Sequence, residues 1–76
     1  MKVLTKLMVL ALVDNPNGVD VQEIKGEQIS VIELKVSKED IGKVIGKQGN
    51  TAKAMRTILS AASSKLHKRT VLEIIE

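Results

Sequence analysis

The stretch that decides the fold is DIGKVIGKQGNT, residues 40–51, in which Gly46 and Gly49 bracket a lysine and a glutamine. Glycine has no Cβ, so the backbone between these positions can turn tightly with positive φ and lie close to a ligand. The sequence that follows is patterned as a helix, whose first N–H groups and positive dipole end point toward the same place. Lys47 adds a compact positive charge, and Gln48 adds a neutral donor and acceptor. These residue types favour an anionic polymer held by its phosphates.

A Gly-x-x-Gly pattern alone is weak evidence, because a chain with five glycines can carry one in any surface turn. The flanking sequence is more informative. Residues 40–49, followed by Arg-Thr-Ile-Leu at 56–59, resemble the signature of KH (K-homology) domains, whose Gly-x-x-Gly loop clamps single-stranded nucleic acid. The resemblance covers nearly the whole chain and is strongest to the small stand-alone bacterial KH proteins of the KhpA type.

This resemblance implies a single α+β domain over residues 1–76 with the type II KH fold. In that fold, a helix-strand-strand-helix-helix-strand order forms a three-stranded mixed sheet with three helices on one face. The implied function is single-stranded RNA binding by a cytoplasmic, bacterial RNA chaperone or regulator that is not an enzyme. The alternative is a protein-interaction or dimerisation module with weak or vestigial nucleic-acid binding. The intact Lys47 argues against that alternative, because a loop freed from phosphate binding does not need the charge.

Hydrophobic periodicity predicts the same elements. Helical spacing indicates a first helix over about residues 2–13. Its apolar face would comprise Leu4, Leu7, Met8 and Ala11. Alternation indicates two strands, at residues 19–22 and 32–36, which a turn at residues 25–28 joins into a hairpin. A final strand over residues 71–75 would face the core through Leu72 and Ile74.

The helices on either side of the glycine loop carry capping signals. Ser37 and Asp40 follow the capping-box pattern and would open a short helix that ends at Gly46. Asn50 or Thr51 would cap the third helix, which runs to about residue 65. Its main apolar stripe would comprise Ala52, Met55, Leu59, Ala62 and Leu66.

Composition excludes several classes of protein. Without cysteine and with a single histidine, the chain cannot form disulfides or a zinc site, so no metal or cofactor is expected and a reducing cytoplasm fits. The net charge of +3 permits nucleic-acid binding without being diagnostic. No aromatic residue occurs, so bases must rest on aliphatic side chains. The apolar run at residues 7–13 is too short to span a bilayer.

The resemblance implies an RNA groove with the glycine loop on one wall and backbone groups of residues 71–73 on the other. Ile41 and Ile45, with Ala52 and Met55, would support the bases. Ala52 stands where KH domains usually carry a branched aliphatic residue, which implies a shallower groove floor. The candidate RNA-binding residues are Ile41, Gly42, Lys43, Ile45, Gly46, Lys47, Gln48, Gly49, Asn50, Thr51, Lys53, Lys68 and Arg69.

Two groups of cations have an ordinary alternative. Lys43 and Lys53 lie about one turn from the loop, where they either reach neighbouring phosphates or only keep a helix soluble. Lys68 and Arg69 belong to the segment that, in type II KH domains, forms the variable loop facing the glycine loop. Their alternative role is to cap the C-terminus of a helix, where cations are favourable.

A second apolar stripe on the third helix comprises Ala54, Ile58 and Ala61. So small a domain buries only about 60% of the surface its unfolded chain exposes, and it would gain stability by covering this stripe. Ile58 would then contact a second copy or a second KH protein. Alternatively, the helix is buried on a wide arc under the first helix.

Overall fold

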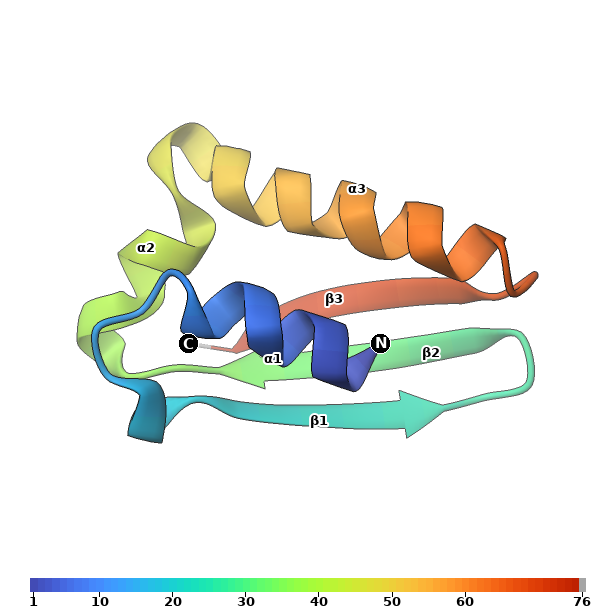
Figure 1. The fold of residues 1–76 in the computed structure, drawn as a ribbon, viewed down its shortest axis with the longest axis horizontal. Helices are drawn as coiled ribbons and strands as arrows, with labels where there is room; N and C mark the ends of the chain where they lie inside the picture. Colours follow the sequence, from blue (N-terminus) through green and yellow to red (C-terminus); the bar gives the residue numbers. More distant parts are fainter. Residues whose placement is uncertain (76) are drawn as a thin grey trace.

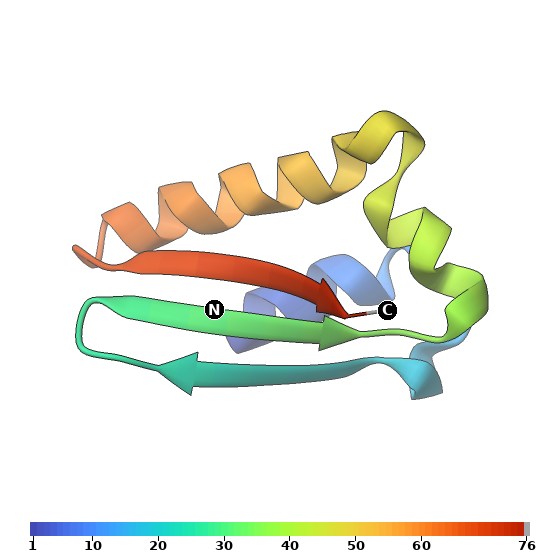
Figure 2. The same ribbon diagram turned by 180° about the vertical axis from the view of Figure 1, so that it is seen from behind.

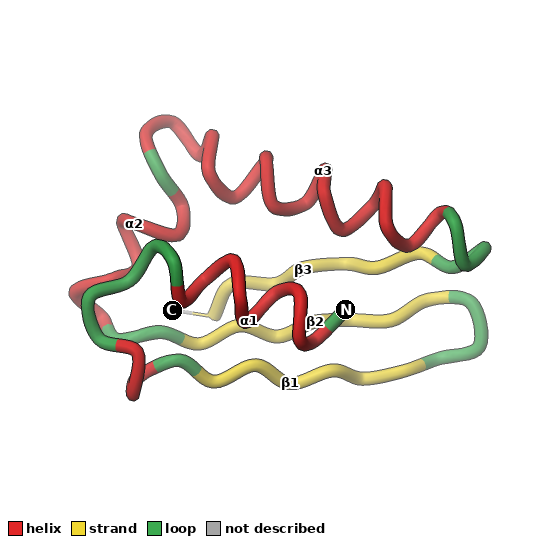
Figure 3. Tube along the Cα trace, in the orientation of Figure 1, coloured by secondary structure: helices red, strands yellow, loops and turns green. Residues whose placement is uncertain are grey.

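The order of helices and strands is the one that the sequence predicts. The computed structural model describes residues 1–75. Its main elements are α1 (Lys2–Leu10), β1 (Asp20–Lys25), β2 (Ile29–Lys35), α2 (Ile41–Ile45), α3 (Asn50–Ser64) and β3 (Arg69–Ile75) (Figure 1). Single 3-10 turns lie at η1 (Pro16–Gly18), η2 (Lys38–Asp40) and η3 (Lys47–Gly49). In Figure 3, where every helix is red, η2 runs directly into α2 and η3 into α3.

The three strands form one mixed sheet in the order β1-β2-β3. The first two strands pair antiparallel, and Gly26 N–H bonds the Ile29 carbonyl at 2.8 Å to close the predicted hairpin turn. The β3 strand pairs parallel to β2, so α2, the glycine loop and α3 form the crossover between them. In Figure 2 the sheet lies in front of α1, while Figure 1 shows α1 over the sheet and α3 along β3.

All three helices bury apolar side chains against the same face of the sheet. The shared core comprises Val9, Val21, Ile32, Leu34, Val44, Met55, Leu59 and Leu72. Ile74 packs on its edge, so the prediction that β3 faces the core through Leu72 and Ile74 is confirmed. The α+β fold with three helices on one face of a mixed sheet is therefore the observed one.

The first helix is shorter than predicted, and of its predicted apolar face only Leu4 and Met8 pack against the core. It ends at Leu10, and the buried residues are Thr5 and Val9, whereas Leu7 is 63% exposed and Ala11 is exposed. The helix also carries Lys2, Thr5 and Lys6, so its apolar residues do not coincide with the face that the sheet buries. Burial of Thr5 is possible because its hydroxyl donates to the Met1 carbonyl at 2.8 Å.

The predicted stripe on α3 is wrong at its C-terminal end. Leu66 is 61% exposed because the chain has already left the helix at Ser64. The buried residue one turn after Leu59 is instead Ser63, whose hydroxyl bonds the Thr70 hydroxyl of β3 at 2.5 Å. A polar residue thus occupies the place where the pattern predicts an aliphatic one.

The predicted side-chain caps of the second and third helices do not form among the described residues. Asn50 is the first residue of α3 and Gly49 is its N-cap, so neither Asn50 nor Thr51 caps the helix with its side chain. Ser37 precedes η2 but makes no capping bond, because its hydroxyl accepts a hydrogen bond from the Asn15 amide at 2.7 Å.

Candidate nucleic-acid interface

The glycine loop joins α2 to α3 in a backbone conformation that its first glycine requires. Gly46 has φ 77° and ψ 176°, a region that is populated essentially by glycine alone. A Cβ at this position would lie 2.8 Å from the Thr51 backbone nitrogen and would overlap the Thr51 side chain. Gly49 has φ 76° and ψ 10°, and a Cβ there would meet nothing within 4 Å. Gly46 is therefore the position that allows the chain to fold back onto α3.

The tip of the loop presents Lys47 and Gln48, and both are exposed. Gln48 adopts the left-handed conformation with φ 58° and ψ 26°, which costs a residue with a side chain about 1–2 kcal/mol. Strain of this kind persists where the surrounding structure imposes it, often at ligand sites. The N-terminus of α3 opens directly behind this tip and has no side-chain cap among the described residues. The Asn50 N–H already bonds the Lys47 carbonyl, so the N–H groups that follow it in the first turn are the ones that could serve an anion.

Lys43 is engaged by carboxylates. Its ammonium forms an ion pair with Asp14 and lies 3.6 Å from the Asp40 carboxylate. The hydrogen bond to Asp14 raises the pKa of Lys43 above its usual value. The sequence predicted that Lys43 either contacts a phosphate or only keeps the helix soluble. In the structure its charge instead pairs with carboxylates and connects α2 to the loop before β1.

Asp40 is the residue whose role sequence analysis missed. Its side chain is buried, and its carboxylate accepts hydrogen bonds from the N–H groups of Asn15 at 3.0 Å and Asp14 at 3.3 Å. Burial raises the pKa of Asp40, but these backbone bonds and the Lys43 charge outweigh it and leave the pKa below its usual value. Asp40 thus anchors the start of α2. The capping-box pattern gave no hint of this role, because the partners lie 25 and 26 residues away.

A shallow hollow of about 600 Å³ lies beside α2. It is lined by Val36, Lys38, Ile41 and Gly42, so two predicted groove residues share it with a lysine that the sequence did not single out. Ile45 is half-buried on the same short helix. The hollow offers an aliphatic wall with one cation at its rim.

Ala52 and Met55 do not line a groove, and the prediction that they support bases is wrong. Both are 3% exposed, because this face of α3 is turned toward the sheet. Thr51 is half-buried against Gly46, while Asn50 and Lys53 are exposed on the first turns of α3. The missing branched side chain at position 52 therefore affects the core and not a groove floor.

The outer edge of β3 is partly occupied. Arg56 of α3 donates from Nε and Nη2 to the Leu72 carbonyl at 3.4 and 3.3 Å. Arg69 N–H bonds the Gln28 carbonyl on the β2 side, so the alternation of the strand turns the Leu72 backbone groups toward the open edge. Within the predicted 71–73 wall, Leu72 is consequently the residue whose backbone faces outward.

Lys68 and Arg69 do not face the glycine loop. Lys68 ends the turn after α3 and Arg69 begins β3, at the opposite end of this helix from the loop (Figure 1). Fifteen helical residues span about 22 Å, so the helix separates the two positions by roughly that length. The prediction that this segment faces the loop across a groove is wrong.

Within residues 1–75, every helix is too short or too polar to cross a membrane.

Comparison with known proteins agrees with this geometry. The family model described as KhpA/KhpB, KH domain, matches residues 2–74. The RNA-binding protein KhpA of Caldanaerobacter subterraneus subsp. tengcongensis is 57% identical over 72 residues, which cover 95% of this chain and 96% of that protein. The proteins of the same name from Clostridium perfringens and Aquifex aeolicus are each 53% identical, over 99% and 100% of this chain and 100% and 96% of their own lengths. None of the solved structures compared matches the chain.

Proposed function

The chain belongs to the KhpA/KhpB KH-domain family, and we propose that it binds single-stranded RNA by holding the phosphate backbone on its glycine loop. The relatives carry RNA binding in their names, and the family is a non-enzymatic one. The observation that carries the proposal is the loop itself. Gly46 adopts a conformation populated essentially by glycine, and Lys47 and Gln48 are exposed in front of the N-terminus of α3, which has no side-chain cap among the described residues.

In this proposal the loop binds about four nucleotides, the number that a Gly-x-x-Gly loop clamps. Backbone N–H groups of the loop and of the first turn of α3, other than those of Gly49 and Asn50, which bond carbonyls within the loop, donate to phosphate oxygens, and Lys47 neutralises one charge. Lys38 and Lys53 are the nearby cations without an ion pair among the described residues. Bases rest on the aliphatic wall of the hollow, where Ile41 and Gly42 lie.

The test is the variant Lys47→Asp/Gln48→Asp, which turns two carboxylates toward the phosphates from an exposed loop. We expect it to fold like the wild type by circular dichroism and to lose measurable binding of labelled single-stranded RNA. The charge-matched control is Lys6→Asp/Gln28→Asp, which changes two exposed residues away from the loop by the same total charge. Unchanged RNA affinity in the folded loop variant, or an equal loss in the control, would contradict the proposal.

We further propose that the chain pairs with a second copy or another KH domain through Ile58. This side chain is 47% exposed on α3, and the neighbouring Ala54 and Ala61 are exposed too, so the stripe is not buried under α1. Small side chains beside Ile58 allow a second helix to approach closely. Pairing would place two four-nucleotide sites on one assembly and raise the affinity through effective concentration.

A further inference from the structure

The helix-covered face of the sheet changes from apolar to polar at one end. Residues in register across the three strands share a face, and the row Val21, Leu34, Ile74 belongs to the apolar core. Two residues further along each strand, Glu23 lies beside two buried core residues, Ile32 and Leu72. The next row consists only of polar residues: Lys25, Ser30 and Thr70. An apolar row would stabilise the fold more, so this polarity calls for a reason.

The turn between α3 and β3 also has polar residues where apolar ones are usual. The N–H of Lys68 bonds the Ser63 carbonyl and that of His67 bonds the Ser64 carbonyl, both at 3.1 Å, with His67 at φ 56°. This is the Schellman arrangement of a helix C-terminus, in which the donor and the acceptor residue of the bond that spans more of the chain usually make a hydrophobic contact. Here these two positions hold Ser63 and Lys68. The turn therefore delivers a cation and a hydroxyl to the end of the polar row.

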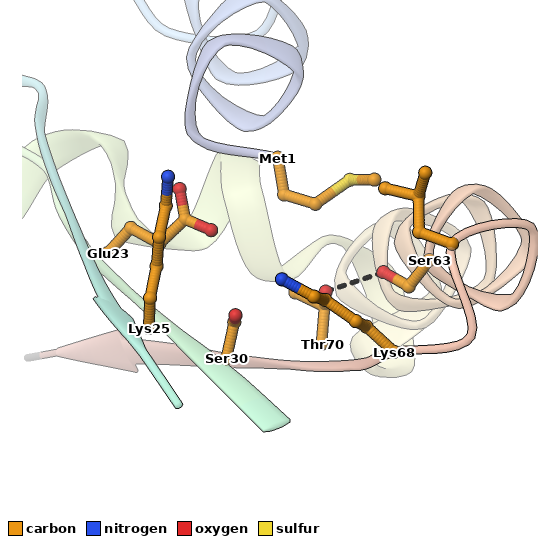
Figure 4. Close-up of a pocket in the computed structure, with 8 residues that line it drawn as sticks. Met1, Glu23, Lys25, Ser30, Ser63, Lys68 and Thr70 are labelled. Atoms are coloured by element: carbon orange, nitrogen blue, oxygen red, sulfur yellow. Dashed lines mark hydrogen bonds between the residues drawn. The ribbon is translucent and has the colours of Figure 1, made fainter. Parts of the chain in front are cut away.

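A pocket of about 150 Å³ lies where the row and the turn meet (Figure 4). Lys25 and Lys68 enter it from different sides, with the Ser30 hydroxyl between them. Neither lysine has a carboxylate partner within 4.0 Å in the described chain, and the Ser30 hydroxyl bonds no other side chain there. A water molecule fills about 30 Å³ in the liquid, so the pocket has room for a group several times larger.

We propose that this pocket binds a phosphate group, as a second anion site distinct from the glycine loop. The two ammonium groups are hydrogen-bond donors only, and the Ser30 hydroxyl can turn its proton toward a bound oxygen. The Thr70 hydroxyl bonds that of Ser63, and it donates to the ligand when Ser63 is the donor in that bond. Glu23 also lines the pocket and opposes the anion, which limits the affinity and provides a handle for testing. The ligand is either a phosphate of an RNA strand or free inorganic phosphate, because both present the same tetrahedral oxyanion.

The experiment is a titration of the isotopically labelled protein with inorganic phosphate, followed by backbone amide NMR against sodium chloride of equal ionic strength. We expect phosphate-specific shifts at Ser30, Lys68 and Thr70. The variant Lys25→Met/Lys68→Met should lose them, whereas Glu23→Gln should lower the dissociation constant about two- to fivefold, the size typical of one exposed charge pair.

Two exposed lysines elsewhere provide the matched control, Lys6→Met/Lys35→Met, which should retain the shifts. The proposal is overturned if phosphate shifts only the glycine loop, if the shifts persist in Lys25→Met/Lys68→Met, or if Glu23→Gln weakens binding. The variant Lys47→Asp/Gln48→Asp should still bind phosphate in the pocket, so failure of the loop proposal and failure of this one are distinguishable. Titration with a short RNA, with and without a 5′-phosphate, then identifies the source of the group.

Discussion

Substitution of Gly46 by alanine tests whether the loop conformation is required. With φ 77° and ψ 176°, a residue with a Cβ is strained by about 1–3 kcal/mol. The Cβ would also lie 2.8 Å from the Thr51 backbone nitrogen, which the first turn of α3 holds in place. We expect the two effects to lower the free energy of unfolding by about 3 kcal/mol, out of roughly 4–11 kcal/mol for a domain of this length.

Two other glycines provide internal controls in the same segment. A Cβ on Gly42 meets nothing within 4 Å, and this residue lies inside α2. Gly42→Ala should therefore raise the free energy of unfolding by about 0.5–1 kcal/mol through helix propensity. A Cβ on Gly49 is equally free of contacts but has φ 76°, so Gly49→Ala should lower stability by about 1 kcal/mol.

Urea unfolding of the three variants measures their free energies of unfolding. RNA titration of the same samples measures how each substitution in the loop segment changes RNA affinity. The expected ranking is Gly42→Ala above wild type, then Gly49→Ala, then Gly46→Ala, with the largest loss of RNA affinity in the last. If Gly46→Ala unfolds within about 0.5 kcal/mol of Gly49→Ala, the steric argument for Thr51 is wrong, because conformation alone would then explain both.

The dependence of RNA affinity on salt should be shallow, with a log–log slope of about −1.5 to −2, because Lys47 and at most two neighbours such as Lys53 contact phosphates. A much steeper slope would indicate that a broad basic surface binds instead. The pKa of Asp40 is below its usual value in the fold, so its contribution to stability is present above the unfolded pKa of about 3.9 and is lost as the pH falls through the folded pKa. Thermal melts between about pH 7 and pH 2 should thus show that Asp40→Asn lowers the Tm most near neutrality and less in acid. A lowering of the Tm that does not change with pH would refute the anchor role. His67 has φ 56°, so His67→Gly should raise the free energy of unfolding by about 0.5–1 kcal/mol, measured by urea, and a loss would contradict the strain. Ile58→Asp should convert a dimer into a folded monomer in sedimentation equilibrium, and a wild type that is already monomeric at high concentration would end the pairing proposal.

Local signals predicted the elements well, because each depends on residues that are near one another in the chain. The turn at Gly26, the end of α2 at Gly46 and the alternation around Leu72 are all decided within a few positions. The faces of helices were harder to predict. In α1 apolar side chains lie on more than one face of the helix, so the sheet beneath it decides that Val9 is buried and Leu7 is exposed.

The loop conformation was predictable from its two glycines, whereas contacts between side chains far apart in the sequence were not. The two loop glycines could be identified from their own chemistry. The partners of Asp40 and Lys43 lie 25 to 29 residues away in the loop before β1, and no pattern within α2 indicates them. The position of Lys68 depends on the length of α3, which carries it to the far end of the sheet.

The parallel pairing of β2 with β3 has a consequence for how the domain is assembled. Every pair in that register, from Ile29 with Arg69 to Lys35 with Ile75, joins residues 40 positions apart (69 − 29 and 75 − 35). The hairpin of β1 and β2, in contrast, closes between near neighbours at Ile29 and Gly26. Because long loops close more slowly than hairpins, we expect the hairpin early and β3 late on the folding pathway. The glycine loop lies inside the segment that this last step closes, so a partly folded chain would contain the loop sequence without the loop conformation.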